Sequence, residues 1–319
     1  MIMTVLKKFL TTITLAFLFN ILVGQQNPIN PVYYWAFNPY VYNPAISGSK
    51  DYISVDFASS FRGKDNTQFL GANTRLSRKQ AGYFSSADIV EYENVGISGS
   101  VFNDLMGSSR NTGANLAGSY QFAMDERRIS FLSVGASIKG VYNSVDTGST
   151  ETGHQYKKTF FPNADFGIYY YGPSITAGLS VINMLGNPEK PDSLGHYTIP
   201  VARQYFLTAG YKIILSRTYD IVLEPSIVIN AYDSTFKHIE ENIDPVIKLY
   251  IDNICLGSYF FTNGSYAFFA KYKYPGFYVG AFFEIPKKTP LYRKNPTIEF
   301  TLGLNIQPLR YKKSRARHW

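Results

Sequence analysis

The side chains that could do chemistry are few in this sequence, and they are scattered. The four histidines, His154, His196, His238 and His318, fall in segments that we expect to be loops or the C-terminal tail. None stands on a predicted strand beside a serine and a carboxylate, as a hydrolytic triad would require. The sequence also has no glycine-rich phosphate loop and no cysteine–histidine spacing typical of a metal site. It therefore predicts a protein that is not an enzyme and has no cofactor, with a barrel hydrolase as the remaining catalytic alternative.

Two other groups of reactive residues have simple interpretations. The segment 233–244 could hold a cation through Asp233, His238, Glu240, Glu241 and Asp244. A charged, solvated loop is the favoured interpretation, because the spacing of a calcium-binding loop is absent. The only cysteine, Cys255, excludes an internal disulfide and is interpreted as a small side chain in a strand.

Ten further ionisable residues share one property, since each lies on the polar side of a predicted strand. The acids are Asp56, Asp165, Glu224, Glu284 and Glu299, and the bases are Lys139, Lys212, Lys248, Lys271 and Lys273. Successive side chains of a strand point to opposite faces of its sheet, so we expect these residues to face one common interior. Equal numbers of acids and bases favour ion pairing across that interior, or a plug, over a strongly ion-selective pore.

The segments that carry these charges follow a two-residue period. Ile53, Val55, Phe57 and Phe61 alternate with small or polar residues, and the same alternation returns at 114–122, 132–142, 175–181, 221–229 and 298–306. Such alternation between turn signals is typical of antiparallel strands. We expect about fourteen strands, at residues 51–61, 66–75, 93–102, 112–122, 129–142, 163–170, 174–182, 205–214, 220–232, 245–251, 254–261, 265–274, 277–285 and 297–306.

The apolar sides of the clearest strands contain no Asp, Glu, Lys or Arg. A charge on a lipid-facing wall costs roughly 2–4 kcal/mol near the membrane midplane, so this absence favours an apolar side that faces lipid. A barrel of about fourteen strands also encloses a lumen too wide for side chains to fill, which predicts a polar, wet or plugged interior. The predicted fold class is therefore all-β, a single transmembrane antiparallel β-barrel. Pro225, inside the strand 220–232, predicts a bulge.

The predicted connections differ in length. Short turns are expected at 124–128, 171–173, 215–219, 252–253 and 275–276, and long loops at 143–162, 183–204, 233–244 and 286–296. Short turns on one side and long loops on the other are typical of outer-membrane barrels. The long connection 76–92 breaks the pattern, because it falls on the side of the short turns.

The N-terminus reads as an export signal. Lys7 and Lys8 precede the apolar stretch 9–23, and the bond between Gly24 and Gln25 is a plausible cleavage point. An uncleaved anchor is the lesser alternative, because the stretch is short for a membrane-spanning helix. The predicted organisation is a signal peptide at 1–24, a periplasmic strap or plug segment at 25–50, the outer-membrane barrel at 51–308 and a basic tail at 309–319.

The C-terminal tail is strongly basic, with Arg310, Lys312, Lys313, Arg315 and Arg317. It could be a periplasmic hook for an acidic partner or for lipid headgroups, and a solvated, disordered end is the simpler alternative. The net charge of +8 could suggest nucleic acid, but an exported barrel would not meet any.

The segment before the first strand carries a family resemblance. Residues 33–49 read YYWAFNPYVYNPAISGS, which resembles the N-terminal signature of the PorP/SprF family of the type IX secretion and gliding machinery. The likeness continues in order through GISGSVFNDLMG (96–107), FPNADFGIYY (161–170), TAGY (208–211), LEPS (223–226) and IEFTLGL (298–304). The sequence departs from the family pattern at Trp35 and Ala36, which replace the usual Tyr-Met pair, and in the tail, which runs past the usual end.

The resemblance implies an outer-membrane barrel that supports secretion or surface anchoring of a large adhesin-like client with a C-terminal targeting domain. It also implies contact with periplasmic ring or peptidoglycan-linked components. The residues that we assign to a plug or to partner contact are Phe37, Asn38, Pro39, Asn43, Pro44, Ala45, Gly48, Asn103 and Asp104. Proline stiffens the strap and asparagine bonds to local turns, which suits either a cap of the barrel mouth or a partner site. The rival functions are a general diffusion porin and a purely structural scaffold of a periplasmic ring or motor complex.

Overall fold

The computed structural model describes residues 37–50, 52–80, 89–124, 130–150, 153–186, 203–232, 242–262, 264–287 and 295–306. Two short 3-10 helices, η1 (Pro39–Val41) and η2 (Pro44–Ile46), precede the strands. The strands are β1 (Ile53–Arg62), β2 (Asp65–Gln80), β3 (Ile89–Met106), β4 (Ser109–Ala123), β5 (Phe131–Thr150), β6 (Gly153–Tyr171), β7 (Ile175–Ile182), β8 (Gln204–Tyr211), β9 (Ile213–Ser216), β10 (Ile221–Tyr232), β11 (Ile243–Ile251), β12 (Ile254–Phe260), β13 (Tyr266–Tyr274), β14 (Phe277–Ile285) and β15 (Thr297–Ile306). Among these residues, no helix is long and apolar enough to cross a membrane.

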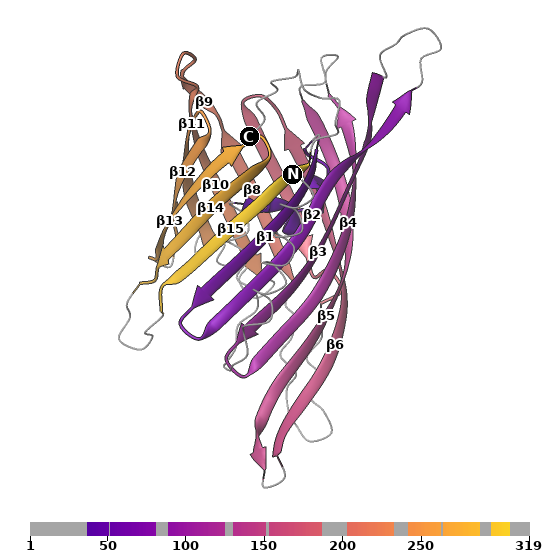
Figure 1. The fold of residues 1–319 in the computed structure, drawn as a ribbon, viewed down its shortest axis with the longest axis vertical. Helices are drawn as coiled ribbons and strands as arrows, with labels where there is room; N and C mark the ends of the chain where they lie inside the picture. Colours follow the sequence, from indigo (N-terminus) through magenta and orange to yellow (C-terminus); the bar gives the residue numbers. More distant parts are fainter. Residues whose placement is uncertain are drawn as a thin grey trace, which may run out of the picture.

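The strands form one antiparallel sheet that closes on itself (Figure 1). Neighbours in sequence are neighbours in the sheet, and β15 returns to pair with β1. β8 and β9 both pair with β10 and are separated only by Lys212, so they share one strand position. The predicted all-β antiparallel barrel of about fourteen strands is thereby confirmed, as a closed barrel of 14 strand positions. Closure leaves no strand edge in the membrane, where unpaired backbone groups would cost several kcal/mol each.

The apolar rows of the strands face outward, as the sequence predicts. Ile138 and Phe300 are 67% and 57% exposed, whereas their sequence neighbours Ser137 and Glu299 are 4% and 0% exposed. The same alternation of exposed and buried residues runs along β4, β8, β13 and β15, and the exposed residues in it are mostly apolar. The apolar face therefore meets lipid, and the polar face meets the lumen.

Two predicted loops are wrong, because the strands on both sides of them continue. Most of the expected loop 143–162 is strand, since β5 and β6 pair from Phe131↔Tyr171 out to Thr150↔Gly153. In the same way β2 and β3 extend into the expected connection 76–92, of which only 81–88 lies outside the described residues. Figure 1 shows both hairpins projecting beyond their neighbours, β5–β6 at the bottom and β2–β3 at the upper right. A hairpin that projects beyond the membrane does not contact lipid and needs no row of apolar residues on its outer face. The two-residue alternation that predicts the other strands is therefore missing from these two extensions.

We call the two ends of the barrel proximal and distal, according to where β1 begins and β15 ends. β1 begins and β15 ends at the proximal end, which is uppermost in Figure 1, and the opposite end is the distal end. The proximal connections 172–174, 217–220, 252–253 and 275–276 are short, as expected. The distal end carries the β5–β6 hairpin and the connections that follow β7, β10 and β14.

Pro225 does not form the predicted bulge. β10 pairs with β11 in unbroken register through Pro225↔Ile247. The irregularity lies in the neighbour on the other side, which is interrupted at Lys212 and shifts register opposite Ile221 and Val222. Proline has no N–H to donate to the neighbouring strand. Because β8–β9 is interrupted beside Pro225, fewer backbone carbonyls are left without a donor there.

The lumen contains apolar side chains as well as polar ones. One buried apolar cluster extends over β10 to β14 and consists of Phe37, Val228, Val246, Cys255, Tyr259, Ala267, Phe269 and Phe282. A second cluster consists of Tyr40, Tyr42, Ile46, Ala58, Phe69, Ile182 and Phe206. Both clusters include residues that precede β1, so the N-terminal segment is part of the interior.

Candidate functional site

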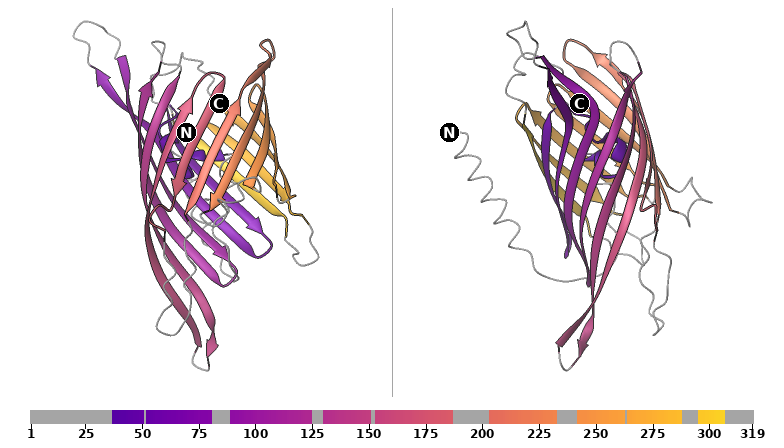
Figure 2. Two further views of the ribbon diagram at one scale, coloured as in Figure 1. Left: turned by 180° about the vertical axis from the view of Figure 1, so that it is seen from behind. Right: turned by 90° about the vertical axis from the view of Figure 1, so that its right-hand side faces the viewer.

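Residues 37–50, which we call the strap, lie inside the barrel before the chain enters β1 (Figures 1 and 2). Every strap residue from Phe37 to Gly48 is buried, except Pro39 and Val41, which are half-buried. η2 contacts β4, β5 and β6, which lie across the barrel from β12, β13 and β14, whereas Phe37 at the start of the strap packs against Phe269 of β13. The strap therefore reaches across the lumen.

The repeated Asn-Pro pair of the sequence builds two turns of the strap. Pro39 and Pro44 each stand at the first position of a 3-10 helix, where the fixed φ of proline suits the turn and its missing N–H leaves no donor unpaired. The Asn43 side chain accepts a hydrogen bond from the Ala45 N–H at 3.0 Å and so caps η2. Two turns in short succession give the strap a fixed path.

Glycines of the barrel wall allow the strap backbone to lie directly against it. A Cβ on Gly96 of β3 would lie 2.1 Å from the Ser47 carbonyl oxygen, and one on Gly135 of β5 would lie 2.5 Å from the Ala45 nitrogen. Both approaches are far closer than van der Waals contact, so only glycine fits there. The wall glycines Gly71, Gly167 and Gly280 stand equally close to Tyr40, Asn43 and Phe37.

Polar wall residues satisfy the backbone carbonyls at the end of the strap. The Ser47 carbonyl accepts a hydrogen bond from the Ser119 hydroxyl at 2.6 Å, and the Gly48 carbonyl accepts one from Gln121 Nε2 at 2.9 Å. Arg75 Nε also donates to the Gly48 carbonyl at 2.9 Å. Gly48 has a φ of +68°, which favours glycine, and its Cα faces the wall. These bonds replace the water that a buried turn would otherwise need.

A carboxylate joins the strap to the opposite wall. Asp56 of β1 is fully buried and accepts hydrogen bonds from the Tyr278 hydroxyl at 2.6 Å and the Tyr40 hydroxyl at 3.1 Å. Burial, and then the adjacent Asp56 charge, raise the pKa of the Tyr40 hydroxyl well above its ordinary value, so it stays protonated and donates. Asn38 of the strap lies 3.2 Å from the Tyr278 hydroxyl. Hydrogen bonds to a charged acceptor are the stronger kind, so Asp56 holds both elements together.

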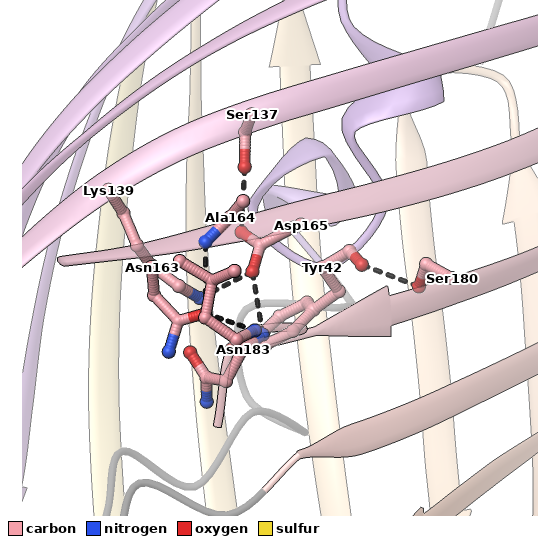
Figure 3. A network of polar contacts seen from close by, with 9 residues as sticks. Tyr42, Ser137, Lys139, Asn163, Ala164, Asp165, Ser180 and Asn183 are labelled. Carbon is pink, nitrogen blue, oxygen red and sulfur yellow. Dashed lines mark hydrogen bonds and ion pairs between the residues drawn. The ribbon is translucent and has the colours of Figure 1, made fainter. Parts of the chain in front are cut away.

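Apolar and backbone contacts complete the attachment. The Phe37 ring meets the Phe269 ring edge to face, with 5.9 Å between centroids. The Ser180 hydroxyl donates to the Tyr42 carbonyl at 2.6 Å, as Figure 3 shows. Of the strap residues singled out from the sequence, all seven lie in this segment, and all but Pro39 are buried.

The ten strand charges all lie on the inward face, and several form pairs along the wall. Lys139 Nζ lies 2.8 Å from Asp165 Oδ1, and Lys248 Nζ lies 2.9 Å from Glu224 Oε1. Each pair joins two adjacent strands, β5 with β6 and β10 with β11, instead of crossing the lumen. Figure 3 shows that Asp165 also accepts from the Ser137 hydroxyl and the Asn183 N–H.

The remaining strand charges have different surroundings. Glu284 lies 3.9 Å from Arg62 and accepts from the Thr297 hydroxyl. Lys212 and Lys271 lie over the rings of Tyr171 and Tyr278, at 5.1 and 4.1 Å from the centroids. The carboxylate oxygens of Glu299 have no hydrogen-bond partner among the described residues. The inward charges are therefore only partly paired.

Asn103 and Asp104 are not brought together with the strap. They stand near the distal end of β3, whereas the strap meets β3 at Gly96 and Ser98. Asp104 faces inward, is fully buried and accepts from the Thr67 hydroxyl at 2.6 Å, while Asn103 accepts from Arg110 at 2.8 Å. Among the described residues, their side chains form hydrogen bonds with side chains of β2 and β4.

Several other predicted elements lie outside the described residues. These are the signal segment 1–24, the tail 309–319 with its five basic residues, the loop 233–241, and His196, His238 and His318. His154 stands on β6, so its expected loop position is wrong. Among the described residues, no group of three or more His, Cys, Asp or Glu side chains could hold a metal ion.

The sequence reasoning missed the wall side of the site. Tyr278, Gln121, Ser119 and the glycines Gly96 and Gly135 hold the strap, but none was singled out beforehand. Glycines at inward positions of otherwise regular strands were the one available signal, because glycine in a strand often marks a close backbone approach.

Comparisons with known proteins identify a family and several solved structures of low similarity. The family model described as type IX secretion system membrane protein PorP/SprF matches residues 23–304. No curated protein matches the chain. Similar solved structures include a bacterial polysaccharide outer membrane secretin, with 11% identity, 81% of this chain and 99% of that chain covered, and a TM-score of 0.40. The NanC porin has 8% identity, coverage of 80% and 100%, and a TM-score of 0.38. The β domain of the Bordetella autotransporter BrkA has 12% identity, coverage of 80% and 98%, and a TM-score of 0.36.

These solved structures are outer-membrane barrels, and at such low similarity they carry no argument about activity. The family match is different, because it runs through the strap, the barrel wall and most of β15. The expected resemblance is thereby confirmed, and the chain belongs to the PorP/SprF family of type IX secretion system membrane proteins.

Proposed function

We propose that this outer-membrane barrel is a non-enzymatic accessory of the type IX secretion system that supports secretion or surface anchoring of one large, adhesin-like client. Family membership supports the pathway, and the closed barrel with its apolar exterior supports the outer-membrane location. The distal loops and the distal mouth of the lumen receive the C-terminal targeting domain of the client. The proximal end meets periplasmic ring or peptidoglycan-linked components.

The observation that carries the proposal is the strap. A diffusion channel needs an open lumen, but here a buried segment crosses the interior and is attached to β1, β3, β4, β7 and β14 by hydrogen bonds. An apolar cluster occupies a further part of the lumen beside β10 to β14. A barrel filled in this way is suited to holding proteins at its two mouths.

The lengths of the connections support an orientation with the proximal end in the periplasm. Outer-membrane barrels keep short turns in the periplasm and longer loops outside. The connections 172–174, 217–220, 252–253 and 275–276 at the proximal end, where β1 begins and β15 ends, are all short. The distal end has two tight turns, at 63–64 and 107–108, but it also has the long connections that follow β7, β10 and β14. Cleavage of a signal peptide at 1–24 agrees with this orientation, because the strap would then start in the periplasm.

The test of the proposal is deletion of the gene, followed by surface proteomics of the mutant. We expect one adhesin-class protein with a C-terminal targeting domain to disappear from the surface while other type IX clients persist. Normal display of every such client would contradict the proposal. A second measurement separates the porin alternative: purified protein in planar bilayers should give no large, steady open-channel current, and such a current would favour diffusion.

A further inference from the structure

Two charged residues lie on the outer face of the barrel. Among the side chains that the structure describes, the outward rows of the strands contain no Asp or Glu, and their cationic residues are Arg110 of β4 and Lys158 of β6. Both side chains are exposed. A charge on this face is costly at the membrane midplane and is tolerated close to the headgroups. Arg110 and Lys158 therefore mark the headgroup level of the wall.

The two cations lie on one rung of the sheet. Arg110 is directly opposite Ser144 of β5, and Ser144 is directly opposite Lys158; we call these three residues the basic rung. Their strands β4, β5 and β6 lie side by side in Figure 1. Residues opposite each other on adjacent strands share one face, and two strand spacings place the Arg110 and Lys158 Cα atoms about 10 Å apart. Both long side chains can converge above the small Ser144, whose hydroxyl adds a donor between them.

A neutral side chain, and not a carboxylate, orients the arginine of the basic rung. Arg110 Nε donates to Asn103 Oδ1 at 2.8 Å, and the same oxygen accepts a hydrogen bond from the Thr112 hydroxyl at 3.1 Å. The Arg110 charge is therefore not neutralised, and its terminal nitrogens remain available to a ligand. Within the described part of the chain, neither Arg110 nor Lys158 forms an ion pair. An anion that reaches the basic rung would meet two positive charges.

The neighbouring residues place the basic rung at the distal edge of the apolar band. The next outward rung toward the proximal end consists of Thr112, Tyr142 and Phe160, and the two rings are 43% and 62% exposed. Exposed aromatic rings at the end of the apolar band are typical of the girdle beside the headgroups. Toward the distal end, β4 begins at Ser109, and the β5–β6 hairpin projects beyond it. The basic rung therefore lies where acyl chains give way to headgroups.

We propose that the basic rung binds the phosphate of a lipid headgroup in the outer leaflet. This inference rests on the proposed function, which places the distal end outside the cell. The terminal nitrogens of Arg110 donate two hydrogen bonds to the phosphate, and Lys158 adds a point charge from the other side. The Ser144 hydroxyl donates to a remaining phosphate oxygen. The acyl chains of the bound lipid lie along Tyr142 and Phe160.

The surroundings of the basic rung favour a lipid over a free anion or a polypeptide. A free phosphate would make no contact with the apolar wall beside the cations. A client polypeptide approaches through the distal loops and the mouth of the lumen, whereas the basic rung is on the outer face. A phosphorylated lipid carries its anionic group and its acyl chains in the order in which the wall presents cations and exposed rings.

The experiment uses the full chain in nonionic detergent and monophosphoryl lipid A as the probe, with bound lipid counted by native mass spectrometry over a titration. The test variant carries Arg110→Gln and Lys158→Gln. The control carries Arg217→Gln and Lys64→Gln, which remove the same two residue types from exposed turns outside the basic rung. We expect the test variant to bind the lipid roughly 10- to 30-fold more weakly and the control to bind like the wild type, because each cation at the headgroup level adds to the attraction.

Selective weakening in the test variant supports the inference, and so does weak binding of the same lipid once its phosphate has been removed. Equal affinity of the test and control variants overturns it, as does unchanged binding of the dephosphorylated lipid. Displacement of the lipid by an equal concentration of inorganic phosphate also overturns it, because the site would then be one for free anions. The measurement needs neither client nor cell. A failed lipid site and a failed client assignment therefore give separate results.

Discussion

Replacing Gly96 by alanine should loosen the strap without disturbing the barrel wall. The new Cβ would lie 2.1 Å from the Ser47 carbonyl oxygen and 2.7 Å from the Gly48 Cα, and both are backbone atoms. They can give way only if the strap moves off β3. Gly99→Ala is the matched control on the same strand, because its Cβ would meet nothing closer than 3.7 Å.

The size of the effect follows from the cost of overpacking. Forcing one extra carbon into a filled interior costs typically about 1–3 kcal/mol. If the substitution destabilises the docked strap by this amount, the population with an undocked strap rises by about 5- to 160-fold. Tyr40 and Tyr42 are 4% and 5% exposed when the strap is docked, so chymotrypsin reaches them only after undocking. The cleavage rate should rise by the same factor while reclosing outpaces cleavage.

The assay is limited chymotrypsin digestion in detergent, with the cleavage sites read by mass spectrometry. Heat-dependent gel mobility of the intact barrel serves as the check on folding, and we expect it to stay unchanged in Gly96→Ala. Equal cleavage rates after Tyr40 and Tyr42 in Gly96→Ala and Gly99→Ala would refute the argument that the wall glycine is required for docking.

Three further outcomes are expected. Tyr278→Phe removes one donor from buried Asp56 and should lower the free energy of unfolding by about 1–3 kcal/mol in urea titration, whereas exposed Tyr274→Phe should change it little. Lys139→Met leaves the Asp165 carboxylate buried without its ion partner and should lower the free energy of unfolding by about 3–5 kcal/mol in the same titration. Adding Asp165→Leu should restore part of that loss. A double variant as unstable as the single variant would contradict this reasoning. Cys255 is 4% exposed inside the apolar cluster, so a maleimide should label it only after denaturation, and rapid labelling of the native barrel would show that the cluster is open.

The fold was predictable because its signals are local. Alternating apolar residues and the absence of charge on one side of each strand come from lipid contact along that strand alone, and neither depends on which strand is adjacent. Ile138 and Phe300 could therefore be assigned to the outer face from their own neighbours in sequence. The β5–β6 and β2–β3 extensions could not, because residues beyond the membrane are under no such constraint.

The candidate site was half predictable. The pair Asn43 and Pro44 predicts a capped turn without any knowledge of the rest of the fold, so the strap could be identified from the sequence. Its partners Tyr278 and Gln121 lie far away in the chain, and nothing near them in sequence distinguishes them from other inward residues. The balanced charges predicted either ion pairing across the lumen or a plug, and the first of these is wrong for Lys139 and Asp165, which pair between adjacent strands.

The amino-acid order alone determined that this chain forms a membrane barrel, which face meets lipid, and which segment precedes the wall, since each follows from short-range periodicity and composition. Only the closed structure decided where the strap runs, which glycines it rests on and which charges pair along the wall. Those properties depend on the register at which fourteen strand positions close, because closure fixes which distant residues share one level of the lumen.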